Sequence, residues 1–142
     1  MTSSRAAVAP AGGRALHVAL WVAQALLAFT FGIAGFIKLT QPLASLATQM
    51  PWTTAVPGVL VRFIGVSELA GALGLILPAA TRILPRLTPA AAGGLVLIMG
   101  MAAAFHLSRG ELYMLPMNGV LGLLAAFVAW GRLAARPIAP RV

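Results

Sequence analysis

The chain has 142 residues, of which 61% are hydrophobic and 8% are charged, and its mean hydropathy is +0.97. A soluble globular domain is only about half apolar, and so few charges cannot cover a water-exposed surface. These values exclude a soluble domain and indicate one compact bundle of membrane helices. The lack of cysteine excludes disulfides, CxxC redox chemistry and cysteine-based metal sites.

The net charge of +8 arises from nine arginines and one lysine against two glutamates. Because the basic residues lie singly between apolar runs, they do not form the patch that binds nucleic acid, and we expect no nucleic-acid partner. The two histidines, His17 and His106, fall near opposite membrane faces, so we expect no metal site.

Four segments are long and apolar enough to cross a bilayer, which takes about 20 residues. They cover residues 15–37, 56–77, 87–107 and 112–131. We therefore expect an all-α integral membrane protein with a four-helix bundle at residues 15–131. The flanking segments 1–14 and 132–142 are basic and rich in small residues, and we expect mobile tails there. The first span is too long for a signal sequence, so we interpret it as a retained helix.

The first loop contains apolar residues at helical spacing, namely Pro42, Leu43, Leu46, Ala47 and Met50. This spacing predicts a short amphipathic helix on the outer membrane surface, and an ordinary loop is the alternative. Prolines near the second and third spans mark boundaries, because proline ends a helix or is tolerated in its first turn. The sequence thus predicts that the second span ends before Pro78.

Four crossings place both termini on the same side as the loop between the second and third spans. The basic residues on that side are Arg5, Arg14, Arg82, Arg86, Arg132, Arg136 and Arg141. The opposite loops contain only Lys38 and Arg109 as basic residues. By the positive-inside rule, we expect a multi-pass protein of the cell (inner) membrane with both termini in the cytoplasm.

Two charged residues lie within the second span. At about 1.5 Å of rise per residue, Glu68 lies near its middle and Arg62 about 9 Å nearer the outer face, and the two side chains point about 120° apart. They cannot pair with each other. Arg62 can extend to the interface along its aliphatic stem, whereas Glu68 is too short and needs a proton, a cation or a wet cavity. Glu68 is therefore the candidate proton relay.

Partners for Glu68 can be ranked by depth. Asn118 is expected about 5 Å outside the bilayer midplane, His106 about 12 Å outside it, and Lys38 at the outer interface. We therefore expect an outward-facing ligand site formed by Lys38, Arg62, Glu68, His106 and Asn118. Each residue also has a purely structural interpretation, since His and Asn often form hydrogen bonds that link membrane helices.

Glycines repeat at every third residue around Glu68, at Gly65 and Gly71, and Gly35 precedes Lys38 by three residues. Small residues at this spacing let helix backbones approach closely in lipid. We therefore expect Glu68 to face a packed interior rather than lipid. Chance is the alternative, because glycine is common in membrane helices.

Three sequence elements occur together with the four spans. They are the G-x-x-K of residues 35–38, the PLASL of the loop that follows, and the ELAGALGLILP of residues 68–78. In this combination the chain, over about residues 18–131, resembles the DoxX-like family of small four-helix bacterial membrane proteins. The resemblance implies a four-helix fold and extends to Lys38 and Glu68.

Known members of that family have different activities. They include a subunit of an archaeal thiosulfate:quinone oxidoreductase and a mycobacterial membrane partner of thiosulfate sulfurtransferase and superoxide dismutase. A distant animal relative assists receptor assembly. The resemblance therefore implies a fold more firmly than a reaction.

Three functions agree with these features. The first is a non-catalytic subunit, scaffold or assembly partner of a membrane complex, in which Glu68 holds helices together. The second is a redox-associated subunit that binds a quinone or similar apolar ligand near Glu68 and works with a membrane or peripheral redox protein. The third is proton-coupled transport, which would need a homo-oligomer because four spans leave little room for alternating access. The sequence itself requires no cofactor, and enzymatic activity is expected only within a quinone-linked oxidoreductase.

Overall fold

The computed structural model describes residues 11–141, and within that range it contains helices and loops but no strand. In chain order the elements are α1 (Ala11–Thr40), α2 (Leu43–Gln49), the 3-10 helix η1 (Pro51–Ala55), α3 (Gly58–Thr81), α4 (Leu87–Ser108), the 3-10 helix η2 (Leu112–Met114), α5 (Leu115–Trp130) and the π-helical turn η3 (Gly131–Ala135). Four helices are long and apolar enough to cross a membrane. The predicted all-α four-helix membrane bundle is confirmed.

Helix bounds extend beyond the predicted spans at both ends of the chain. α1 begins at Ala11, so residues 11–14 of the expected tail are helical, and η3 continues α5 as far as Ala135. Hydropathy marks where the bilayer ends, whereas a helix continues as long as its backbone groups can hydrogen-bond to one another. The remainder of the expected N-terminal tail, residues 1–10, lies outside the described residues, as does Val142.

The second span does not end before Pro78, and that prediction is wrong. α3 passes through Pro78, which is buried, and continues to Thr81. Proline removes one backbone N–H from a helix, but neighbouring helices compensate for this loss inside a membrane bundle. The helix ends instead at Arg82, whose backbone adopts the left-handed conformation with φ of 62°.

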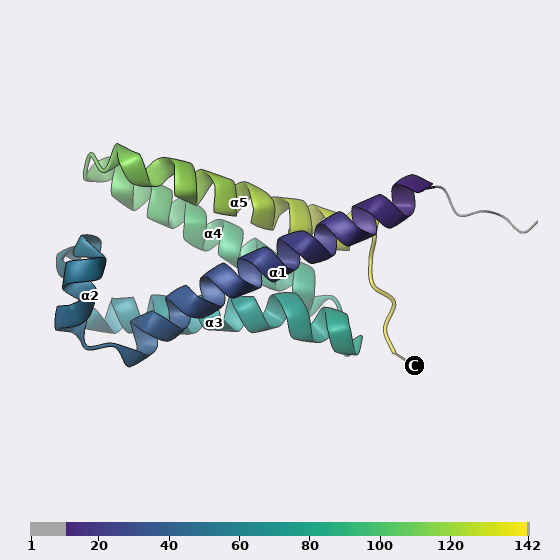
Figure 1. The fold of residues 1–142 in the computed structure, drawn as a ribbon, viewed down its shortest axis with the longest axis horizontal. Coiled ribbons are helices and arrows are strands. Elements are labelled where there is room, and N and C mark those ends of the chain that lie inside the picture. Colours follow the sequence, from purple (N-terminus) through teal and green to yellow (C-terminus); the bar gives the residue numbers. More distant parts are fainter. Residues whose placement is uncertain (1–10, 142) are drawn as a thin grey trace, which may run out of the picture.

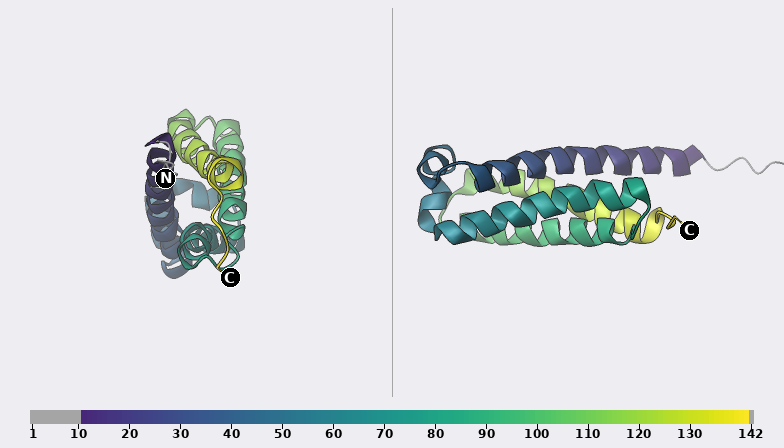
Figure 2. Two further views of the ribbon diagram at one scale, coloured as in Figure 1. Left: turned by 90° about the vertical axis from the view of Figure 1, so that its right-hand side faces the viewer. Right: turned by 90° about the horizontal axis from the view of Figure 1, so that it is seen from below.

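The short helix predicted in the first loop is present as α2, followed directly by η1. The two elements cross one end of the bundle (Figure 1), and the side chain of Leu46 in α2 is fully buried. We call this end, which also contains the loop between α4 and α5, the cavity end. The opposite end, where α1 begins and η3 ends, is the tail end (Figure 2).

The long helices form two antiparallel pairs, α1 with α3 and α4 with α5. In the view of Figure 1 the pairs lie apart at the cavity end and meet towards the tail end, where α1 crosses α5 and a short loop joins α3 to α4. The buried core between the pairs includes Leu27, Phe31, Leu75, Leu95 and Val128. Packing is thus continuous in the middle and at the tail end.

Apolar side chains also cover the outside of the bundle. Phe29, Val59 and Leu123 are 70%, 77% and 74% exposed. Exposing so much apolar surface to water is unfavourable, whereas a bilayer about 30 Å thick accepts it without cost. The outer surface therefore faces lipid over the length of the four spans.

Candidate functional site

A close approach of α1 and α3 builds the centre of the site. A Cβ atom on Gly35 would lie 2.7 Å from the carbonyl oxygen of Gly65, and a Cβ atom on Gly65 would lie 2.9 Å from Cβ of Lys38. Only glycine fits at such positions without moving a backbone. The close packing expected from the glycine spacing is therefore present, and it lets a side chain of α1 reach Glu68.

Lys38 is the partner of Glu68. Its Nζ lies 2.7 Å from Oε2 of Glu68, and both side chains are 6% exposed. Of the three expected ways to accommodate Glu68, a proton, a cation or a wet cavity, the structure shows a cation, but the depth ranking, which put Asn118 nearest, misidentified the partner. Lysine has a long flexible stem, so its ammonium lies well away from its own backbone level.

The ion pair lies on the wall of a cavity of about 480 Å³ between the two helix pairs, in the half of the bundle next to the cavity end. Its lining also includes His106 and Asn118, while most of the remaining lining is apolar, such as Phe31 and Met99. Four of the five candidate residues therefore meet in one cavity. Ligand pockets commonly have this size and this composition of apolar walls with few polar groups.

Arg62 is the candidate residue that does not line the cavity. Its guanidinium donates from Nη1 to the carbonyl oxygen of Lys38, and from Nη2 to that of Gln41 at 2.7 Å. The last carbonyls of a helix lack partners within the helix, and a nearby arginine can satisfy them. Arg62 therefore fixes the C-terminal end of α1 rather than contributing to a ligand site.

Asn118 contributes a polar group without a partner. Its Nδ2 atom is buried and makes no hydrogen bond to any described residue. A buried unsatisfied donor costs about 1–3 kcal/mol, so such a group usually has a ligand or a water as its acceptor. Asn118 belongs to α5, opposite the Lys38–Glu68 pair on α1 and α3.

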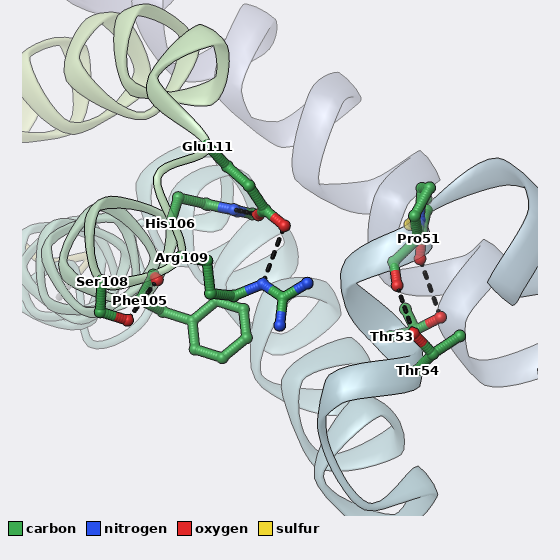
Figure 3. Close-up of polar contacts among 9 residues, drawn as sticks. Pro51, Thr53, Thr54, Phe105, His106, Ser108, Arg109 and Glu111 are labelled. Carbon is green, nitrogen blue, oxygen red and sulfur yellow. Dashed lines mark hydrogen bonds and ion pairs between the residues drawn. The ribbon is translucent and has the colours of Figure 1, made fainter.

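Three polar side chains, of which only His106 lines the cavity, meet at the end of α4. Glu111 Oε2 lies 2.6 Å from Nδ1 of His106, and Glu111 Oε1 accepts a hydrogen bond of 2.8 Å from Nε of Arg109 (Figure 3). The hydrogen bond from His106, and to a smaller extent that from Arg109, lowers the pKa of the Glu111 carboxyl below its ordinary value. His106 is thereby held in place on the cavity wall.

An aromatic side chain covers the cavity from the cavity end. Trp52 of η1 lines the cavity, packs edge-to-face on Phe105 with the ring centres 6.4 Å apart, and has its ring centre 6.0 Å from Nζ of Lys38. Hydroxyls of Thr53 and Thr54 bond back to carbonyls within the same turn and stabilise η1 (Figure 3). Trp52 therefore connects η1 to both helix pairs above the ion pair.

Sequence reasoning missed Trp52 and Glu111 as parts of this site. The inward direction of Trp52 depends on how η1 folds across the bundle, which its position in the sequence does not show. Glu111 is the second of only two acids and follows His106 by five residues, so its sequence position does contain a signal. A turn after α4 brings the two side chains together.

The cavity also reaches the outer surface of the bundle. Phe63 of α3 and Met101 of α4 line it and are 66% and 57% exposed. An apolar molecule dissolved in the surrounding lipid could therefore enter between these helices.

Four membrane-spanning helices enclosing a cavity with a buried ion pair define a multi-pass helical membrane protein. The profile of the DoxX-like family matches residues 22–128, and the chain belongs to this family. The resemblance seen in the sequence is thus confirmed. Searches of curated proteins and of solved structures found no match.

Proposed function

We propose that the protein binds a small apolar molecule with hydrogen-bond-accepting oxygens in the cavity beside Glu68. The observation that carries this proposal is the unpartnered Nδ2 donor of Asn118 on the wall of a largely apolar cavity of about 480 Å³. An apolar wall binds a ring or chain, and a few fixed donors orient its oxygens. The exposure of Phe63 and Met101 supports entry from the lipid.

A quinone fits this set of groups, and the family resemblance supports it. Its ring is planar and apolar, and its two carbonyl oxygens could accept from Asn118 on one side and from Lys38 or His106 on the other. When bound, a quinone would supply two-electron chemistry for a partner redox protein. The Lys38–Glu68 pair would hold a proton beside it, since both groups can exchange protons.

Asn118→Ala tests the proposal. Protein purified in mild detergent is extracted with organic solvent, and quinone is measured per folded protein. Loss of one neutral hydrogen bond should weaken retention about fivefold. Gln49→Ala, which removes an exposed amide outside the cavity, is the matched control and should leave retention unchanged. Wild-type protein that carries no quinone and binds no added short-chain quinone would refute the proposal.

A scaffold or assembly role is the second candidate, and the ion pair itself favours it. Lys38 and Glu68 connect α1 to α3, so they can act as a structural link with no ligand. Removing one partner of a buried pair leaves an uncompensated charge and costs about 3–5 kcal/mol. If Glu68→Gln lowers the yield of folded protein or of a co-purifying partner while quinone retention per folded molecule stays constant, the scaffold role is supported.

We also propose that the tail end faces the cytoplasm of a cell whose inner membrane holds the protein. Arg14, Arg82, Arg86, Arg132 and Arg136 all lie towards that end of the bundle. The excess of arginine near one set of helix ends supports this orientation. A reporter enzyme that is active only outside the cytoplasm should be inactive when fused to the C-terminus.

A further inference from the structure

A second group of polar side chains is buried in the tail half of the bundle, away from the cavity. Arg132 of η3 is 3% exposed, and its Nε donates to Oε1 of Gln24 on α1 at 2.6 Å. Gln24 is fully buried and donates from Nε2 to the carbonyl oxygen of Leu75 on α3 at 2.5 Å. Two helices therefore fix the orientation of one buried guanidinium.

The π-helical turn directs Arg132 inward. The backbone N–H of Arg136 donates to the carbonyl oxygen of Gly131, five residues earlier, at 2.6 Å. Gly131 lies against α1, since a Cβ atom there would be 2.3 Å from a methyl carbon of Leu20. Single π turns are rare and often occur at functional sites.

The hydrogen bond between Trp21 and His17 determines which ring nitrogen of His17 carries the proton. The indole N–H of Trp21 lies 3.1 Å from Nε2 of His17 and can only donate, so Nε2 accepts. A neutral imidazole then carries its proton on Nδ1. That Nδ1 lies 3.4 Å from Nη1 of Arg132, which is also a donor. Two donors thus face each other without an acceptor between them.

The terminal nitrogens of the Arg132 guanidinium also lack good hydrogen-bond acceptors. Nη2 of Arg132 makes no hydrogen bond to any residue in 11–141, and Nη1, besides its contact with His17, has a long contact of 3.5 Å to the carbonyl oxygen of Arg136. Within the same residues, both carboxylates are engaged elsewhere, Glu68 with Lys38 and Glu111 with His106 and Arg109. The indole of Trp21, 5.4 Å from the guanidinium carbon, supplies only a weak cation–π contact.

We propose that Arg132 and His17 bind an oxyanion of the phosphate class at the junction of α1 and η3. A phosphate oxygen accepts from several donors at once and neutralises arginine, which is what this group of side chains lacks. His17 is exposed, so an oxyanion can approach it from the surface. Gln24 is a positioning residue, because it holds the guanidinium without facing the ligand.

Two sources can supply this chemistry, a lipid phosphodiester and free phosphate. Val18 and Val22 follow His17 on α1 by one and five residues, are 55% and 53% exposed, and present an apolar surface to the membrane. The acyl chains of a lipid could lie along these valines with the phosphate at His17. The site is separate from the cavity and does not depend on any ligand there.

The test uses the full chain and two probes. In the first arm, the protein is reconstituted in a mixture of phosphatidylglycerol and phosphatidylcholine, whose phosphodiesters together are the first probe, and all phospholipid retained after detergent extraction is counted by native mass spectrometry. In the second arm, inorganic phosphate is titrated in a non-ionic detergent while thermal unfolding is followed. Arg132→Gln should reduce binding at least about tenfold, and His17→Ala about threefold. Arg86→Gln, an exposed arginine at the same end, is the control and should bind normally.

Each result gives a clear answer. Retention of either phospholipid that requires Arg132 and His17 assigns a lipid phosphate, whereas stabilisation by inorganic phosphate alone assigns a free oxyanion. The proposal is overturned if wild-type protein binds neither probe, or if His17→Ala and Arg132→Gln bind as the wild type does. Because His17 is exposed, its replacement remains informative even if Arg132→Gln does not fold.

Discussion

Glu111 lies outside the membrane spans, and the side chains around it favour its ionised form. Its pKa is lowered from 4.5 by hydrogen bonds from His106 and Arg109 in the folded protein. A lowered pKa means that the unfolded chain takes up the proton first as the pH falls. The stabilisation is therefore complete above pH 4.5, decreases below it, and is absent once the pH is below the folded value.

Glu111→Gln should remove this dependence on pH. Thermal unfolding of both proteins in detergent, measured from about pH 7 to about pH 3, should show a smaller decrease in Tm for the variant. Glu68 pairs with Lys38 and is the same in both proteins, so its contribution cancels in the difference. Parallel curves for wild type and variant would show that the hydrogen bonds of Glu111 with His106 and Arg109 contribute nothing to stability.

The Lys38–Glu68 ion pair shows which features of a functional site can be predicted from the amino-acid sequence. A carboxylate at mid-span is costly, so the need for a proton, a cation or a wet cavity followed from Glu68 alone. The identity of the partner depended on how far Lys38 reaches and on how closely Gly35 lets α1 approach α3. The reach of a side chain and the distance between two helices are properties of the packed bundle. They cannot be calculated from the depth of each residue along an isolated helix.

Glycine spacing acts at the scale of helix pairs, and two glycines of α1 allow a matched test. A Cβ atom at Gly35 would collide with the backbone of α3, 2.7 Å from the Gly65 carbonyl oxygen, whereas at Gly32 it would make an ordinary contact of 3.7 Å with Ala72. Gly35→Ala should therefore separate the helices and destabilise the protein by about 1–3 kcal/mol. Gly32→Ala should be neutral or stabilising, because alanine favours a helix by up to about 1 kcal/mol.

Denaturant or thermal unfolding in detergent measures both variants. Equal effects at the two positions would mean that backbone contact at Gly35 and Gly65 does not determine the pairing of α1 with α3. Quinone retention of Gly35→Ala should also decrease, because the same separation moves Lys38 away from Glu68.

Helix number and approximate spans could be predicted because hydropathy reports the bilayer directly. The passage of α3 through Pro78 could not, since it depends on compensation by neighbouring helices. The π turn that aims Arg132 was equally hidden, because an arginine just after Trp130 is the usual pattern at a membrane interface. In both cases a local signal for ending a helix was overridden by tertiary contacts.

At the scale of the whole molecule, the two helix pairs are held differently at their two ends. Gln24 links α1 to Leu75 of α3 and to Arg132 of η3, so three elements are fastened in the tail half. In the other half the pairs enclose a cavity, covered by Trp52. Empty or loosely filled space forfeits contacts, so the cavity costs stability unless a ligand occupies it.

Filling the cavity should therefore change stability and binding in opposite directions. Ala102 of α4 lines the cavity, and Ala102→Leu places three more carbon atoms in it. Cavity-filling substitutions commonly add about 0.5–2 kcal/mol, so Tm of the ligand-free protein should rise, while affinity for a short-chain quinone should fall at least about tenfold. Ala104→Leu, exposed on the same helix and outside the cavity lining, should change neither. A variant with lower Tm and undiminished quinone binding would show that the space beside Ala102 belongs to the packing of the bundle and not to a ligand site.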